Sequence, residues 1–249
     1  RHRFTTAGAS LLYLDRGETV DEVLRAAVDG TGRGEVVHAA EGIQHIAPVE
    51  GLLVVARDAP GATSVLEAVA PDGAVQSLAL PDGARIERLV PPPFGTLLAM
   101  ILLVPDPAAE GALVEVLATI DLAGGTAVDV VAGLDGAPVR AVAAEFLPDA
   151  RTLIVHAFDL TLLRVELAEP PLALPVGQVP TMYGLSTDGT RVTGSDSFGG
   201  VVIDLASGVE ERLDPSPVDG AFAFGGESRL TRGALRVQKV AVPDESGGS

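Results

Sequence analysis

A chain of 249 residues with a net charge of −17 is a poor partner for nucleic acid, because binding to phosphates requires clustered lysine and arginine. The same charge opposes docking on an anionic membrane. The most apolar run, residues 96–104, is too short for direct membrane insertion, which takes about 20 residues. Cysteine and asparagine are absent, which excludes disulfides, thiolate zinc sites and N-linked glycans.

Short apolar runs, rich in valine and leucine and bounded by Gly, Pro and Asp, follow one another along the chain and predict β-strands. Runs that follow a first turn begin near residues 10, 52, 96, 151, 190 and 228, at intervals of 42, 44, 55, 39 and 38 residues. Residues 19–28 also fit a short helix, but their place in the repeat favours a strand. A period of about 40 to 45 residues with several strands per unit is typical of propeller blades.

Two units show the pattern most fully. In the fourth unit we expect strands at residues 139–146, 152–158, 160–167 and 172–176. In the fifth we expect them at residues 182–185, 190–195, 201–205 and 210–213. The sequence therefore predicts an all-β, six-bladed β-propeller of four-stranded antiparallel blades, built as one domain over residues 1–242. A disordered tail, residues 243–249, should follow.

The last unit stops after its third strand, and the chain begins with a strand-like segment, "HRFTTAG". We expect this segment to start the first blade or to pair beside the last one, which places the two termini close together. Asp-Gly pairs at residues 72–73, 82–83, 135–136 and 188–189 predict hairpin turns with positive φ at glycine and capping by aspartate.

Residues 186–213, "STDGTRVTGSDSFGGVVIDLASGVEERL", resemble the repeat of TolB-like (WD-repeat-like) propellers. Residues 147–159 are similar, with Ala150 in place of glycine. The resemblance implies a propeller, often an extracytoplasmic location, and a protein-binding or scaffolding role; it implies no catalytic residue. The matching positions are Ser186, Asp188, Gly189, Ser195, Asp196, Ile203, Asp204, Ser207 and Gly208.

Catalytic motifs are missing from the sequence: there is no Gly-x-Ser-x-Gly elbow and no Ser-x-x-Lys. His156 lies inside an apolar run, which favours a packed core histidine over one that faces a channel. Lactonase-like propellers hold a central metal partly with Asn, and quinone-dependent dehydrogenase propellers are rich in Trp. The absence of both residues argues against these two enzyme classes. Glycoside hydrolysis requires two carboxylates at a defined separation, of which Glu145 or Glu41 could supply one.

We therefore expect a non-catalytic sensor, scaffold or docking domain in an extracytoplasmic compartment, without cofactor or metal. It would bind a protein partner or a small ligand on one propeller face. The alternative is a hydrolase, glycosidase-like or lactonase-like, with its site at the propeller channel. An inward cluster of carboxylates with a histidine or metal would favour the hydrolase.

Five predicted blades place an aspartate at or just beyond the end of the second strand. The turn after that strand lies on the same face of every blade, so we expect these carboxylates to attract a cation, a basic peptide or a positively charged partner. The plainer interpretation is that they are turn residues whose carboxylates cap local amides. The predicted ligand-binding residues are Asp15, Asp58, Asp106, Asp159 and Asp196, with Arg16 and Arg57 beside two of them.

Overall fold

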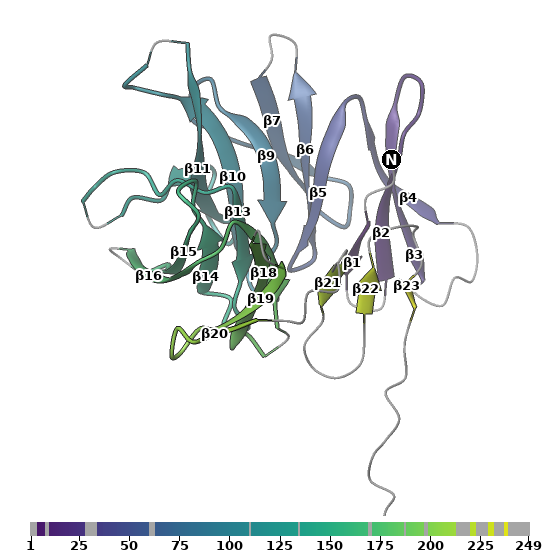
Figure 1. The fold of residues 1–249 in the computed structure, drawn as a ribbon. Coiled ribbons are helices and arrows are strands. Elements are labelled where there is room, and N and C mark those ends of the chain that lie inside the picture. Colours follow the sequence, from purple (N-terminus) through teal and green to yellow (C-terminus); the bar gives the residue numbers. More distant parts are fainter. Residues whose placement is uncertain are drawn as a thin grey trace, which may run out of the picture. The chain divides into compact units, whose positions relative to one another are not determined.

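The computed structural model describes residues 4–7, 10–27, 34–59, 63–109, 111–133, 135–168, 171–186, 188–196, 199–212, 220–222, 229–231 and 237–238. The elements of this part of the chain are all β-strands, paired antiparallel (Figure 1). They fall into two compact units, Arg1–Ala141 and Val142–Ser249, which are described one at a time. The predicted tail and the closeness of the termini fall outside the described residues.

The first unit contains three four-stranded sheets, each with its strands in chain order. The first sheet consists of β1 (Phe4–Ala7), β2 (Ser10–Asp15), β3 (Asp21–Ala27) and β4 (Glu35–Ala40). The second consists of β5 (Ile43–Val49), β6 (Leu52–Ala59), β7 (Thr63–Val69) and β8 (Val75–Leu78). The third consists of β9 (Arg85–Val90), β10 (Leu97–Pro105), β11 (Leu113–Asp121) and β12 (Asp129–Val130).

The second sheet is covered on both faces. Residues 53–56 of β6 are all buried, although successive residues of a strand point to opposite faces. Val55 belongs to one apolar cluster with Leu14 of the first sheet, and Val54 to another with Met100 of the third. The strand β5 lies beside both β1 and β9, so the first strands of the three sheets are neighbours. A continuous apolar run, rather than an alternating one, is what such a sandwiched strand requires.

The second unit repeats this arrangement. The fourth sheet consists of β13 (Ala143–Phe146), β14 (Thr152–His156), β15 (Thr161–Glu166) and β16 (Leu172–Gln178). The fifth consists of β17 (Thr181–Leu185), β18 (Arg191–Asp196), β19 (Gly199–Asp204) and β20 (Glu210–Arg212). A last sheet has three described strands, β21 (Gly220–Phe222), β22 (Arg229–Thr231) and β23 (Val237–Gln238). The strand β17 contacts β13 and β21, so the first strands are again neighbours.

Several predictions about the strands are confirmed. Residues 21–27 form the strand β3 rather than a helix, and the N-terminal segment starts the first sheet by pairing β1 with β2. Two expected strands were too long: the strand expected at residues 152–158 ends at His156, and the segment 139–146 pairs with β14 only from residue 143. For the segment 139–146 the reason is that Val139 accepts a hydrogen bond from the amide of Leu117 in β11 (2.8 Å), which commits it to the third sheet.

The predicted turn chemistry is also present. Gly73, Gly136 and Gly189 have φ of 85°, 77° and 70°. In each of these turns the preceding aspartate accepts a hydrogen bond from the backbone amide two residues beyond itself, at 3.0 Å. Among the described residues there is no helix whose length and hydropathy would let it cross a bilayer.

Candidate functional site

In five sheets the predicted aspartates lie at the end of the second strand or in the turn that follows it, and these segments are called here the second-strand turns. Asp106 accepts a hydrogen bond from the amide of Ala108 (2.9 Å), and Arg140 reaches its other carboxylate oxygen at 3.5 Å. Asp159 caps the amide of Thr161 (3.1 Å), and hydrogen bonds from Thr161 lower the pKa of Asp159. At these two positions the carboxylate has the local capping function of a turn residue.

A polar network connects the first two sheets beside Asp58. The exposed Asp58 carboxylate accepts a hydrogen bond from Gln44 Nε2 at 2.6 Å. Gln44 in turn lies 3.4 Å from Arg16, whose guanidinium forms an ion pair with the buried Asp21 at 2.9 Å. The same Asp21 oxygen accepts the backbone amide of Ile43, the first residue of β5, at 2.9 Å. The network therefore anchors the second sheet to the first.

The other predicted residues are not drawn into this network. The side chain of Asp15, at the end of β2, is exposed to solvent. Asp196 ends β18, but its side chain lies outside the described residues. Arg57 directs its guanidinium to Glu67 of β7, with Nε–Oε2 and Nη2–Oε1 distances of 3.1 and 2.9 Å. Because Arg57 and Asp58 are successive residues of β6, their side chains point to opposite faces of that strand.

Glu67 was missed by the sequence analysis. It is 9% exposed, and the paired Arg57 lowers the pKa of Glu67 through its hydrogen bonds. His38 of β4 acts electrostatically on the same carboxylate; its Nε2 atom is buried without a hydrogen-bond partner, and burial lowers the pKa of His38. The available signal was a lone charge within the apolar run "SVLEAVA", a position where charge requires a partner.

The second unit uses different groups between its fourth and fifth sheets. The Nε2 atom of His156, which is 6% exposed, lies 2.7 Å from the carbonyl oxygen of Val179. A carbonyl can only accept, so Nε2 carries the proton and donates. His156 is thus the packed, hydrogen-bonded core histidine that the sequence favoured. Glu145 of β13 is an exposed residue whose carboxylate accepts the amide of Leu185 in β17 at 3.0 Å; partial desolvation of the carboxyl group raises the pKa of Glu145.

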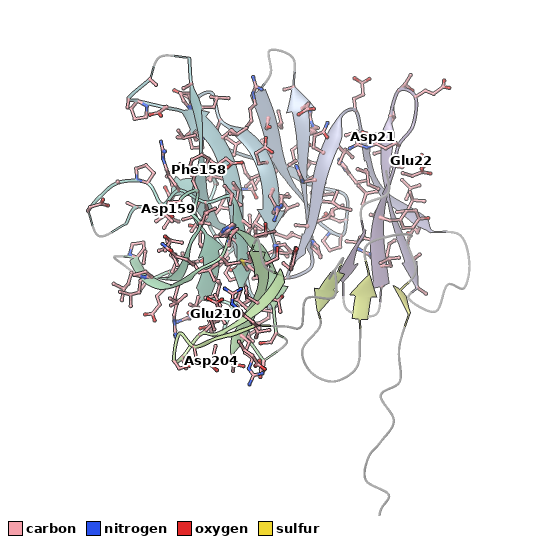
Figure 2. The ribbon with its side chains drawn as sticks, viewed as in Figure 1. Asp21, Glu22, Phe158, Asp159, Asp204 and Glu210 are labelled. Carbon is pink, nitrogen blue, oxygen red and sulfur yellow. The ribbon has the colours of Figure 1, made fainter. Side chains whose placement is uncertain are left out.

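One second-strand turn exposes large apolar side chains. Phe158 and Leu160, on either side of Asp159 between β14 and β15, are 69% and 45% exposed. Figure 2 labels Phe158 and Asp159. Tyr183 of β17 is 37% exposed, and its hydroxyl lies 2.8 Å from Ser195 Oγ. None of these three residues was predicted from the sequence as part of a site. The signal was "HAFDLT", a phenylalanine in a turn of a chain with only 4% aromatic residues.

The described residues contain no group of three or more His, Asp or Glu side chains that could hold a metal ion. Glu145, the carboxylate considered for a hydrolase, bonds to a backbone amide rather than to a second acidic group in the described hydrogen bonds. Among the described residues, the buried carboxylates Asp21 and Glu67 both bind other parts of the protein.

No family model matches the chain, and no curated protein is similar to it in sequence. Its fold resembles that of several solved structures, all of them β-propeller proteins. TolB from Acinetobacter baumannii is 9% identical with a TM-score of 0.52, over 81% of this chain and 50% of TolB. The dihydro-heme d1 dehydrogenase NirN is 16% identical with a TM-score of 0.55, over 84% of this chain and 44% of NirN.

A prolyl endopeptidase is 16% identical with a TM-score of 0.59, over 91% of this chain and 38% of the endopeptidase. The chain therefore spans half or less of the length of these three proteins. At such identities the likeness concerns the fold alone, and the fold of this chain is a β-propeller.

Proposed function

We propose that the chain is a non-catalytic, six-bladed β-propeller that binds a protein partner or a small ligand outside the cytoplasm. The binding face would be the one that carries the second-strand turns, with Asp15, Asp58, Asp106, Asp159 and Asp196. Each sheet would be one blade of a single ring. Support for the blade count comes from the repeat of about 40 to 45 residues and from the contacts between successive first strands within each unit.

One observation carries the proposal: a division between buried and exposed polar groups. Asp21, Glu67 and His156 are buried and engaged within the protein, where they connect strands or sheets. By contrast, the side chains of Asp15, Asp58 and Asp159 are exposed. Carboxylates that face solvent at the second-strand turns of these three sheets would attract positive charge toward that face. The polar groups inside therefore serve stability, and the exposed ones are available for recognition.

The extracytoplasmic location is supported by the TolB-like repeat at residues 186–213 and by the structural likeness to TolB. A cell-fractionation experiment on the full gene product tests it. Recovery of the protein in the cytoplasmic fraction would contradict this part of the proposal.

The binding face is tested with two defined probes, a nona-arginine peptide and calcium chloride, titrated by calorimetry at low salt. We expect the peptide to bind wild type, with an affinity that falls as salt increases. Changing Asp58, Asp159 and Asp196 to Asn should weaken binding at least tenfold, because asparagine keeps an oxygen for capping and removes only the charge.

The matched control changes three aspartates in other hairpin turns, Asp72, Asp188 and Asp204, to Asn. This variant has the same net charge as the test variant and should bind like wild type. Equal weakening in both variants would mean that only the overall charge matters. No binding of either probe to wild type would contradict the acidic face.

A further inference from the structure

The turn between β14 and β15 is a tight three-residue loop with an unusual residue at its end. The amide of Ala157 donates to the carbonyl of Thr161 (2.8 Å), and the amide of Leu160 donates to the carbonyl of Ala157 (3.0 Å). These bonds close a loop of Phe158, Asp159 and Leu160. The last position of such a loop takes a left-handed conformation, and Leu160 has φ of 70°.

Leucine is poorly suited to this conformation. A side chain in the left-handed region brings Cβ against the backbone, and glycine or asparagine normally occupies it. Most other left-handed positions in the described chain are indeed glycine, Gly136 and Gly189 among them. Leu160 is also 45% exposed, so burial offsets only part of the strain. The turn would form more easily with glycine, and the leucine side chain must have another use.

The exposure of Phe158 also indicates a use outside the core. The chain has seven Phe, two Tyr and no Trp, so aromatic side chains are scarce in its core. Phe158 is nevertheless 69% exposed, the largest value among the large apolar residues that the structure describes. Solvent-exposed aromatic side chains are typical anchors of protein–protein interfaces, where their burial contributes much of the binding free energy.

A second aromatic residue lies at the same end of the neighbouring sheet. The carbonyl of Leu160 accepts the amide of Val179 (3.0 Å), so the connection from β16 to β17 runs beside the turn. Thr181 begins β17 and is the cross-strand partner of Ser195. The hydroxyl of Tyr183 reaches back to Ser195 Oγ at 2.8 Å and thus points toward this end of the strand.

The charge of the turn defines the complementary partner. Hydrogen bonds from Thr161 lower the pKa of Asp159, which keeps its carboxylate ionised. Among the described residues Asp159 forms no ion pair, and its side chain, like those of its chain neighbours Phe158 and Leu160, is exposed. A cation that docks beside an apolar group would pair with Asp159, and an arginine could also stack on Phe158.

We propose that the Phe158–Leu160 turn, with Tyr183 and Ser195, docks a protein segment that carries an arginine or lysine next to an apolar side chain. This inference rests on the proposed binding function and names the partner's chemistry. A protein is favoured over a small molecule because the side chains of the turn are exposed to solvent, whereas small ligands bind in concave sites that bury them.

The inference is tested with a library of random peptides displayed on phage and selected on the full wild-type chain. Counter-selection uses the variant Phe158→Ser/Leu160→Gly. Enriched sequences are synthesised with a fluorescent label, and their affinities are measured by anisotropy. The matched control, Phe94→Ser/Val209→Ser, removes apolar side chains that are both 62% exposed in two other turns.

We expect the enriched peptides to share a cation beside an apolar residue. They should bind the counter-selected variant at least tenfold more weakly than wild type, and the control variant within twofold of wild type. Asp159→Asn should weaken binding and reduce its dependence on salt. The thermal midpoint of Phe158→Ser/Leu160→Gly should equal or exceed that of wild type, because glycine removes the strain, so lost binding cannot be ascribed to unfolding.

Enriched peptides that bind wild type and the counter-selected variant equally would overturn the proposal that this turn is a docking site. If such peptides lose affinity in the variant with Asp58, Asp159 and Asp196 changed to Asn, the proposed binding face survives and only this inference falls. Peptides that bind the Phe158→Ser/Leu160→Gly variant more weakly than wild type but contain no arginine or lysine would overturn the assigned partner chemistry. If no peptide is enriched on wild type, the inference also fails, while the arginine-peptide titration still decides the proposed function independently.

Discussion

Two contact regions between neighbouring sheets, called here seams, differ in their chemistry. The first seam lies between the first and second sheets, and the second seam lies between the fourth and fifth. In the first seam Arg57, Glu67 and His38 place three titratable groups near one another. In the second, His156 donates to a backbone carbonyl and Glu145 accepts a backbone amide. Backbone geometry alone therefore does not dictate how neighbouring sheets are joined. The first seam should respond to charge and pH, and the second to shape.

The largest effect should come from removing one partner of the charged seam. Glu67→Ala leaves the Arg57 guanidinium, which is 31% exposed, without its carboxylate. We expect the free energy of unfolding to fall by about 3 kcal/mol, since breaking a mostly buried pair costs far more than breaking a surface pair. Urea unfolding gives the total, and hydrogen exchange should locate the loss in β6 and β7.

The control for this prediction is the double variant Arg57→Met/Glu67→Leu. Replacing both charges by apolar groups of similar volume should recover most of the lost stability. A loss below about 0.5 kcal/mol for Glu67→Ala would show that the pair acts like a surface ion pair, and the contrast between the seams would disappear.

The second seam should be broken by added volume instead of lost charge. Gly189 has φ of 70°, and a Cβ there would clash with Cδ of Pro148 in the turn of the neighbouring sheet. We expect Gly189→Ala to lower the free energy of unfolding by about 2 kcal/mol, from backbone strain and from this clash. The variant Gly189→Ala/Pro148→Ala, which removes the ring, should regain part of the loss in the same urea measurement. No recovery would mean that strain alone is responsible.

The charged seam should also weaken in mild acid. The pKa of His38 is lowered from its usual 6.5, chiefly by burial, with Glu67 raising it and Arg57 lowering it. The folded state therefore binds fewer protons than the unfolded chain, so stability rises with pH in this range. As the pH falls below about 6.5 stability should begin to decline, until the pH reaches the lower pKa of the folded state. Urea midpoints between pH 7.5 and 5 measure this decline.

His38→Gln is the comparison for the pH experiment, because it removes the titrating group and leaves Glu67 and Arg57 in place. Its stability should be flatter between pH 7 and 5.5 than that of wild type. The Glu67 contribution lies lower: its folded pKa is depressed, so its stabilisation is lost only as the pH falls below the ordinary value of 4.5. Identical pH profiles for wild type and His38→Gln would contradict a role for His38.

The sequence predicted the features that depend on nearby residues. Strand positions followed from apolar runs, and turns followed from Asp-Gly pairs, because both are set within a few residues. The seams were not predicted, since contacts such as Glu145 with Leu185 join residues 40 positions apart on different sheets. Nothing local in "AAEF" or "MYGL" fixes how two sheets pack. The sequence shows a phenylalanine at position 158 beside an aspartate, but it does not show that the side chain is exposed. That exposure depends on the three-residue loop seen in the structure.

The smallest effect should come from Ala150, which occupies in the β13–β14 turn the place that Gly189 holds in the β17–β18 turn. Its φ of 54° is unfavourable for a residue with a Cβ, but its methyl group is 6% exposed and loses contacts if removed. These terms oppose each other, so Ala150→Gly should raise the free energy of unfolding by only about 0.5 kcal/mol. The result is compared with Gly189→Ala in the same urea series. A loss larger than about 0.5 kcal/mol would mean that the buried methyl group outweighs the strained backbone, and that the two turns tolerate a side chain for different reasons.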